Sequence, residues 1–151
     1  MSNYPIILLA ITPVLVVGLF AFLPPLKALF VSVLGGWMFL PQAYLVVQGL
    51  PDIDKAVAVS VGVMLATGIF QINRIMSLRP RLADVFLLVY CTSGVLASVT
   101  NGLGLYDGGS TALRDIITVA LPYITGRLYL QKPGDLARLV VALVAAGLIY
   151  V

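Results

Sequence analysis

The sequence predicts an all-α fold, a polytopic bundle of about six transmembrane helices in which the last helix is incomplete. Hydrophobic residues make up 61% of the 151 residues, and charged residues make up only 10%. An average soluble domain carries roughly 25% charged residues. The mean hydropathy is +1.09. Because the charged shell of a soluble domain is missing, this composition excludes soluble globular, disordered and disulfide-scaffold classes.

The first two expected helices form a hairpin closed by a Pro-Pro pair. Residues 6–23 are apolar and give roughly 27 Å of helix, close to the ~30 Å hydrocarbon core of a bilayer. We expect a bend in this helix at Pro13. A second span, residues 26–47, is interrupted by Pro41, which predicts a kink or a change to an interfacial segment near Leu40.

Four further apolar segments follow, separated by polar connectors. They comprise residues 56–72, 82–99, 113–130 and 136–151. The glycine-rich stretch 101–110 is expected to be an external loop. The last segment gives roughly 24 Å of helix, short of the ~30 Å core. We therefore interpret residues 1–151 as a single transmembrane region, the N-terminal fragment of a longer membrane protein. A short or tilted final helix is the alternative.

The basic residues predict the orientation of the bundle. If the connector with Arg74, Arg79 and Arg81 is cytoplasmic, alternation of the helices places seven of the nine basic residues on that side. Only Lys55 and Arg114 then fall outside. This asymmetry follows the positive-inside rule and predicts an external N-terminus. The same topology explains the pI near 9.2, so nucleic acid is not an expected partner.

Several kinds of chemistry are excluded by residue type. The chain has no histidine and a single cysteine, which removes histidine acid–base catalysis, histidine metal ligation and Ser–His–Asp or Cys–His sites. Cys91 lies in an apolar stretch and is interpreted as a small hydrophobic residue. Phosphate-loop, dinucleotide, zinc and hydrolase motifs are all missing. No cofactor and no metal are expected, and catalytic residues stay unassigned.

All six acidic residues are aspartates, and five of them lie at or near the start of an expected helix. A carboxylate at that position accepts hydrogen bonds from unpaired N–H groups and meets the positive end of the helix dipole. Asp84 follows Arg81 by three residues, and Asp135 precedes Arg138 by three. Both spacings are within reach of an ion pair on a helix. Capping and pairing therefore explain these carboxylates better than acid–base catalysis. The five are Asp52, Asp54, Asp84, Asp115 and Asp135.

Asp107 differs from the others because it lies in the expected external loop, directly before two glycines. One interpretation is an Asx-type turn. The other is a contact with a polar substrate, made together with the nearby Arg114. Asp107 and Arg114 are therefore candidate substrate-binding residues.

Arg127 lies about three residues inside the apolar edge of the fifth expected helix. In one interpretation its side chain extends to the cytoplasmic interface, with Tyr129 in the aromatic belt. In the other it faces the bundle interior and binds a phosphate or carboxylate through its planar guanidinium. Pro122 and Gly126 weaken the local helix, which is tolerated where spans line a cavity. Arg127 is the third candidate substrate-binding residue.

Six segments together carry a likeness to a known family. They are LPPLKAL (23–29), LGGWMFLP (34–41), GLPDIDK (49–55), LRPR (78–81) with Asp84, SVTNGLGLYDG (98–108) and LPYITGRLY (121–129). They resemble the N-terminal third of bacterial O-antigen ligase/polymerase-like membrane proteins. The resemblance implies a multi-pass inner-membrane glycosyltransferase that transfers a glycan from undecaprenyl pyrophosphate on the periplasmic side, without metal or nucleotide. It also implies that the catalytic residues lie far C-terminal, so this chain alone is inactive.

Two functional hypotheses follow. The first is the membrane portion of such a ligase or polymerase, with the lipid bilayer and a lipid-linked glycan as partners. The second is a small structural or accessory subunit of a membrane complex, without catalytic activity. Small residues spaced four apart, such as Gly62 and Ala66, would let its helices associate closely with other subunits. A transporter or channel ranks last, because it needs ionisable groups near the bilayer midplane and no aspartate is expected there.

Overall fold

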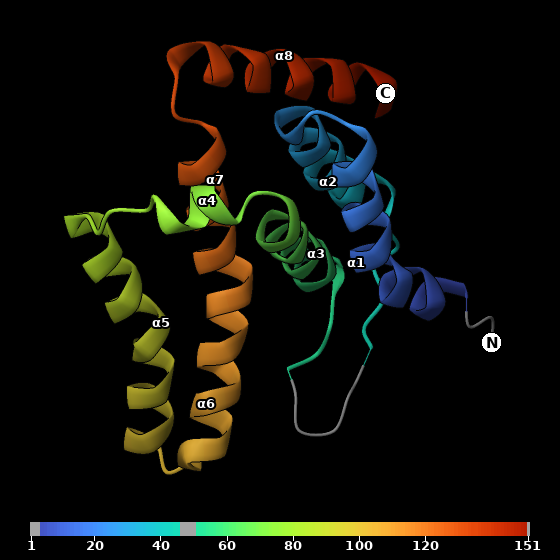
Figure 1. The fold of residues 1–151 in the computed structure, drawn as a ribbon. Coiled ribbons are helices and arrows are strands. Elements are labelled where there is room, and N and C mark those ends of the chain that lie inside the picture. The colour runs from blue at the N-terminus through green and yellow to red at the C-terminus, as the bar shows by residue number, and fades with distance from the viewer. Residues whose placement is uncertain (1–3, 46–50, 151) are drawn as a thin grey trace.

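The computed structural model describes residues 4–45 and 51–150, and these residues form an all-α fold (Figure 1). The predicted fold class is confirmed. The only β contact within the described residues is an isolated antiparallel bridge between Leu45 and Ile53. The helices are α1 (Tyr4–Phe22), α2 (Pro25–Phe39), α3 (Lys55–Phe70), α4 (Ile72–Met76), α5 (Leu82–Thr100), α6 (Gly104–Asp115), the π-helical turn Ile116–Ala120, α7 (Leu121–Tyr129) and α8 (Pro133–Tyr150).

Two of the described helices are long and apolar enough to cross a membrane. These are α1 and α5, each with 19 residues. The apolar helices α2 and α3 are shorter, with 15 and 16 residues. A bundle of six membrane-crossing helices therefore stays a prediction.

The hydrophobic core lies where α1, α2, α3 and α7 meet. Its buried residues are Val16, Phe20, Ala28, Leu29, Val59, Val63, Ala66, Leu128 and Tyr129. Helices α1 and α3 pack closely at Gly62, where an added Cβ would lie 2.9 Å from the Cα of Pro13. A side chain at that position would push the two helices apart.

The loop expected at residues 101–110 is largely helical, which corrects the prediction. The turn between α5 and α6 needs only residues 101–103, because Gly102 and Gly104 take positive φ angles of 73° and 90°. Gly108 serves a different purpose. An added Cβ there would lie 2.9 Å from the Cα of Val95, so this glycine allows α5 and α6 to pack together. A glycine that was interpreted as a turn residue can thus be a position where two helices pack against each other.

The fifth expected span, residues 113–130, is the second half of a longer continuous helix. Helix α6 runs through the π-helical turn Ile116–Ala120 directly into α7, and Figure 1 shows the three as one rod. Asp115 therefore lies in the middle of this rod and not in a first helical turn, so its predicted capping role is wrong. The π turn hydrogen-bonds from residue i to i+5 and so holds more residues per turn than the α-helix on either side.

Helix α2 ends earlier than the span predicted to reach residue 47. It stops at Phe39, and Leu40 takes an extended conformation with ψ of 137°. Pro41 explains the early end, because proline lacks an N–H donor and disfavours helical geometry in the residue before it. The described residues 40–45 are not helical, and residues 46–47 of the prediction lie outside the described residues.

The last helix, α8, lies across the end of the α6–α7 rod (Figure 1) and contacts α2. Its bounds, Pro133–Tyr150, fit the predicted segment 136–151 except for Val151, which lies outside the described residues. Most of its apolar side chains are exposed, including Val141 and Leu148. One polar prediction is confirmed here, because Asp135 pairs with Arg138 across 3.7 Å.

The C-terminal ends of α1, α3 and α7 meet at one end of the bundle. The rings of Phe20 and Tyr129 are 6.1 Å apart, and the Thr67 and Tyr129 hydroxyls are hydrogen-bonded at 3.1 Å. Tyr129 is only 3% exposed, so its predicted place in an interfacial aromatic belt is wrong. Burial of the ring in the core fixes the position of α7. We call this part of the bundle the basic end, defined by Arg74, Arg79, Arg81 and Arg127.

The opposite end of the bundle joins the start of α3 to α6 and α2. Arg114 of α6 pairs with Asp54 at 2.9 Å. Lys55 donates a hydrogen bond to the Trp37 carbonyl at 3.0 Å, and its ammonium lies 5.5 Å from the centre of the Trp37 ring. We call this the Asp54 end, defined by these four residues.

Candidate functional site

A hollow of about 730 Å³ opens at the basic end, between the α4–α5 connector and α7. Three of its ten lining residues are arginines and none is acidic among the described residues, whereas most of the molecule is apolar. The polar side of the wall includes Arg79, Arg81, Tyr123, Arg127 and Gln131. We call this space the arginine hollow.

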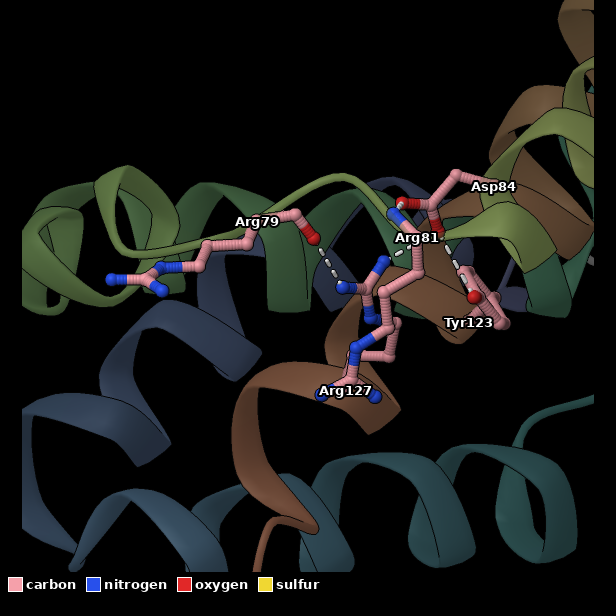
Figure 2. A network of polar contacts seen from close by, with 5 residues as sticks. All are labelled: Arg79, Arg81, Asp84, Tyr123 and Arg127. Atoms are coloured by element: carbon pink, nitrogen blue, oxygen red, sulfur yellow. Dashed lines mark hydrogen bonds and ion pairs between the residues drawn. The ribbon is translucent and has the colours of Figure 1, made fainter.

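Arg127 is held in the hollow from three directions (Figure 2). Its Nη1 donates to the Asp84 carboxylate, and its Nη2 donates to the Arg79 carbonyl at 2.7 Å. The guanidinium carbon lies 5.7 Å from the centre of the Tyr123 ring. The side chain is only 15% exposed. Of the two interpretations of Arg127, the geometry therefore favours the side chain that faces the interior.

Asp84 connects the start of α5 to α7. Its Oδ2 accepts the backbone N–H of Arg81 at 2.7 Å, and its Oδ1 accepts the Tyr123 hydroxyl at 3.0 Å (Figure 2). The predicted role at a helix start is confirmed. The predicted ion pair with the Arg81 side chain is wrong, since the partner is Arg127. Arg81 has extended backbone angles, φ −128° and ψ 159°, so its side chain does not lie on the helix face one turn from Asp84.

The hollow carries more cations than carboxylates. Asp84 is paired with Arg127, and within the described part of the chain neither Arg79 nor Arg81 forms an ion pair. The Arg79 side chain extends away from Arg127 (Figure 2), which places its charge at the rim. Guanidinium groups are donors only. The arrangement therefore favours binding of an anion with several acceptor oxygens.

The other two candidates, Asp107 and Arg114, lie away from this hollow. Asp107 is exposed in the first turn of α6, so the predicted Asx turn in a loop is wrong. Arg114 pairs with Asp54, which also caps α3 by accepting the Val57 N–H at 2.9 Å. Thirteen residues of helix separate Arg114 from Arg127, which is about 20 Å at 1.5 Å per residue. The three candidate residues do not form one site.

Sequence reasoning missed the residues that surround Arg127. Tyr123 and the arginines of the α4–α5 connector were not identified as its neighbours, although the charge pattern placed this connector and Arg127 on the same side of the membrane. Their shared predicted side of the membrane was the one sequence signal that these residues could be neighbours. Among residues 4–45 and 51–150, no group of three or more His, Cys, Asp or Glu side chains could hold a metal ion.

Comparisons of the chain with protein-family models, with curated proteins and with solved structures return no match.

Proposed function

We propose that residues 1–151 are the N-terminal membrane portion of an O-antigen ligase/polymerase-like protein of the bacterial inner membrane, and that the arginine hollow binds a phosphate-bearing anion. Two of the six segments that resemble this family, 78–84 and 121–129, supply most of the wall of the hollow. The proposal includes a chain that crosses the membrane about six times, with α1 and α5 among its spans.

The observation that carries the proposal is the surplus of arginines over carboxylates. Asp84 balances one guanidinium, while Arg79 and Arg81 face or border the same hollow without an acidic partner. Planar guanidinium groups bind phosphate oxygens in pairs, and such charged hydrogen bonds are about twice as strong as neutral ones. A phosphate or pyrophosphate group supplies both the charge and the acceptor oxygens that the hollow lacks.

The proposed role of the hollow is to bind and hold the anion. None of its side chains is a nucleophile activated by a base, so the bond-making step belongs to residues that the resemblance places further along the chain. Charge asymmetry assigns the basic end to the cytoplasmic side, whereas the implied glycan transfer is periplasmic. We therefore assign the hollow to anchoring an anion at the cytoplasmic face, separate from the transfer reaction.

Binding of inorganic phosphate and pyrophosphate to the purified chain in neutral detergent tests the anion site. Calorimetric titration of the Arg81→Gln variant should show about tenfold weaker binding, the loss expected for a charged hydrogen bond worth roughly 1.5 kcal/mol. Arg114→Gln is the matched control, because it removes one arginine charge at the Asp54 end. Equal losses in the two variants would contradict a site at the hollow and indicate non-specific charge attraction.

Cysteine labelling tests the proposed topology. In a Cys91→Ser background, Asn101→Cys lies in the exposed turn between α5 and α6, and Ser77→Cys lies in the exposed α4–α5 connector. A membrane-impermeant maleimide added to intact spheroplasts should label residue 101 and spare residue 77. The reverse pattern would overturn the orientation.

A second candidate function, a structural or accessory subunit, is favoured by the uncovered apolar faces of α5 and α8. Phe86 and Leu96 of α5 are 69% and 68% exposed, and Leu148 of α8 is 76% exposed. Such faces suit contact with lipid or with helices of another subunit. If this function is the correct one, the chain should purify with a stoichiometric partner, and Arg81→Gln or Arg127→Lys should leave that complex and its activity unchanged.

A further inference from the structure

An apolar groove of about 280 Å³ adjoins the arginine hollow. It lies between α2, α3 and the α7 end of the rod, and its wall is formed almost entirely by hydrocarbon side chains. Leu29, Val33 and Trp37 line it from α2, and Val59 and Val63 line it from α3. Among the residues that the structure describes, no charged side chain lines it. A groove of this chemistry accepts hydrocarbon and excludes ions.

One stripe of α7 separates the groove from the hollow. Pro122, Gly126 and Leu130 line both spaces, and residues four apart lie on the same helix face. The neighbouring stripe, which includes Tyr123 and Arg127, lines only the hollow. On the other flank of the shared stripe, Thr125 lines only the groove. The two spaces are therefore adjacent compartments on either side of one helical ridge.

The helical ridge between the two compartments is least bulky at Gly126. This residue has no side chain, and an added Cβ would meet no other atom within 4 Å. Gly126 lines the hollow and the groove alike, so the free space beside it borders both compartments. A ligand with an anionic group and an attached chain can therefore pass over the ridge at this point.

We propose that the hollow and the groove together form the binding site of one phosphate-bearing lipid, with its headgroup at Arg81 and Arg127 and one hydrocarbon chain in the groove. This inference rests on the proposed anion site and adds the identity of the ligand. Free phosphate would leave the groove empty, and a neutral lipid would leave the arginines without a counter-charge. A lipid with a phosphate headgroup matches both the charge of one compartment and the apolar wall of the other, and its phosphate offers the arginines more acceptor oxygens than a carboxylate does.

The single tryptophan of the chain reports directly on the groove, because Trp37 lines it. The chain in neutral detergent is titrated with trace phosphatidic acid that carries brominated acyl chains, and quenching of Trp37 emission is followed. Brominated diacylglycerol has the same chains without the phosphate and serves as the ligand control. Phosphatidic acid should reach half-maximal quenching at a concentration about tenfold lower, and Arg81→Gln should remove this advantage.

Gly126→Leu tests the passage between the two compartments. Leucine is a better helix former than glycine and would extend into open space, so α7 should stay folded. The leucine side chain should keep part of the lipid's hydrocarbon chain out of the groove. Each methylene that is no longer buried costs about 0.8 kcal/mol of binding free energy, so the loss of two buried methylenes raises the half-quenching concentration about tenfold. Gly147→Leu is the matched control, because its added Cβ on α8 also meets no atom within 4 Å and it borders neither compartment. This control should behave as the wild type.

The outcomes separate this inference from the proposed function. If Gly126→Leu binds brominated phosphatidic acid as tightly as the wild type, the two-compartment site is overturned even where inorganic phosphate still binds. If the wild type binds no phosphate in any form, the anion site itself is overturned. Ser60→Leu, which fills the groove from α3, provides a second obstruction and should weaken lipid binding while phosphate binding persists. Thermal unfolding checks that each variant is folded.

Discussion

The two ends of the bundle each carry an aspartate–arginine pair, but the pairs differ in what surrounds them. At the Asp54 end, one carboxylate meets one guanidinium at 2.9 Å and caps α3. The neighbouring Lys55 is satisfied by the carbonyl and the ring of Trp37. At the basic end, Asp84 accepts hydrogen bonds from Arg127, Tyr123 and a backbone N–H. The three other arginines of this end, Arg74, Arg79 and Arg81, pair with no carboxylate among the described residues.

This difference shows that an ion pair is not in itself a sign of a binding site. The Asp54–Arg114 pair closes a contact between α3 and α6, and every group in it has a partner within the chain. The basic end leaves positive charge beside a hollow of about 730 Å³. The sign of a ligand site is therefore an excess of positive charge beside an open space, and not the ion pair itself.

The largest effect on anion binding at the basic end is expected from Arg127→Ala. It removes a guanidinium that is only 15% exposed and leaves Asp84 without its cation. Charged hydrogen bonds contribute about 1.5–3 kcal/mol, so pyrophosphate affinity should fall by roughly tenfold to a hundredfold, and the unfolding temperature should also fall. Calorimetry and thermal unfolding measure the two effects. Arg127→Lys keeps the charge without the planar fork and should recover only part of the affinity.

A smaller effect on binding is expected from the double variant Arg79→Gln/Arg81→Gln. Neither side chain forms an ion pair in the described residues, so the unfolding temperature should stay close to that of the wild type. Phosphate affinity should fall slightly more than the roughly tenfold loss expected for Arg81→Gln alone, because Arg79 lies at the rim and contributes less. The dependence of the affinity on salt should flatten, because fewer exposed charges remain to be screened. An unchanged affinity would show that the surplus charge plays no part in binding.

Asp54→Ala should produce the opposite pattern at the other end. The variant loses both the cap of α3 and the partner of Arg114. Loss of an N-cap costs about 1–2 kcal/mol of folding free energy, which denaturant titration in detergent can measure. Phosphate binding should not change. Weaker phosphate binding in this variant would mean that the two ends are not independent.

The smallest effect is expected from Tyr129→Phe. The buried hydroxyl pair with Thr67 is lost while the ring and its contact with Phe20 remain. One such hydrogen bond contributes about 1 kcal/mol to stability. The exposed Tyr106→Phe is the control and should be neutral. A loss of phosphate binding in Tyr129→Phe would indicate that the position of α7, which this bond helps to fix, controls the hollow.

Helices bounded by a change in polarity were predicted well from the sequence. The segment 82–99 was expected and α5 occupies Leu82–Thr100, while the segment 56–72 was expected and α3 occupies Lys55–Phe70. Both are apolar runs that begin after charged residues. The region around Gly108 was predicted wrongly because a glycine that turns the chain and a glycine that lets two helices touch are identical in one sequence.

The site was predicted only in part. Arg127 was identified from its depth in an apolar run, but its neighbours depend on which helices pack together. Asp84 is 43 residues away and reaches Arg127 only because α5 starts beside the end of α7. Local spacing pointed to Arg81 instead. Arg114 and Asp54 are 60 residues apart, so their pairing could not be predicted from local spacing either. Asp107 and Arg114 were proposed to contact a substrate together only because they are close in the sequence.

The π-helical turn Ile116–Ala120 lets the rod accommodate a change in chain length. Each residue of an α-helix turns the chain by about 100°. A π turn holds about one residue more than an α turn, so deleting one residue from Ile116–Ala120 would let the rod continue as a plain α-helix with Arg127 still facing Asp84. In a rod that was α-helical throughout, the same deletion would rotate Arg127 away from Asp84 by about 100°. A single-codon deletion in this turn should therefore leave the arginine hollow in place.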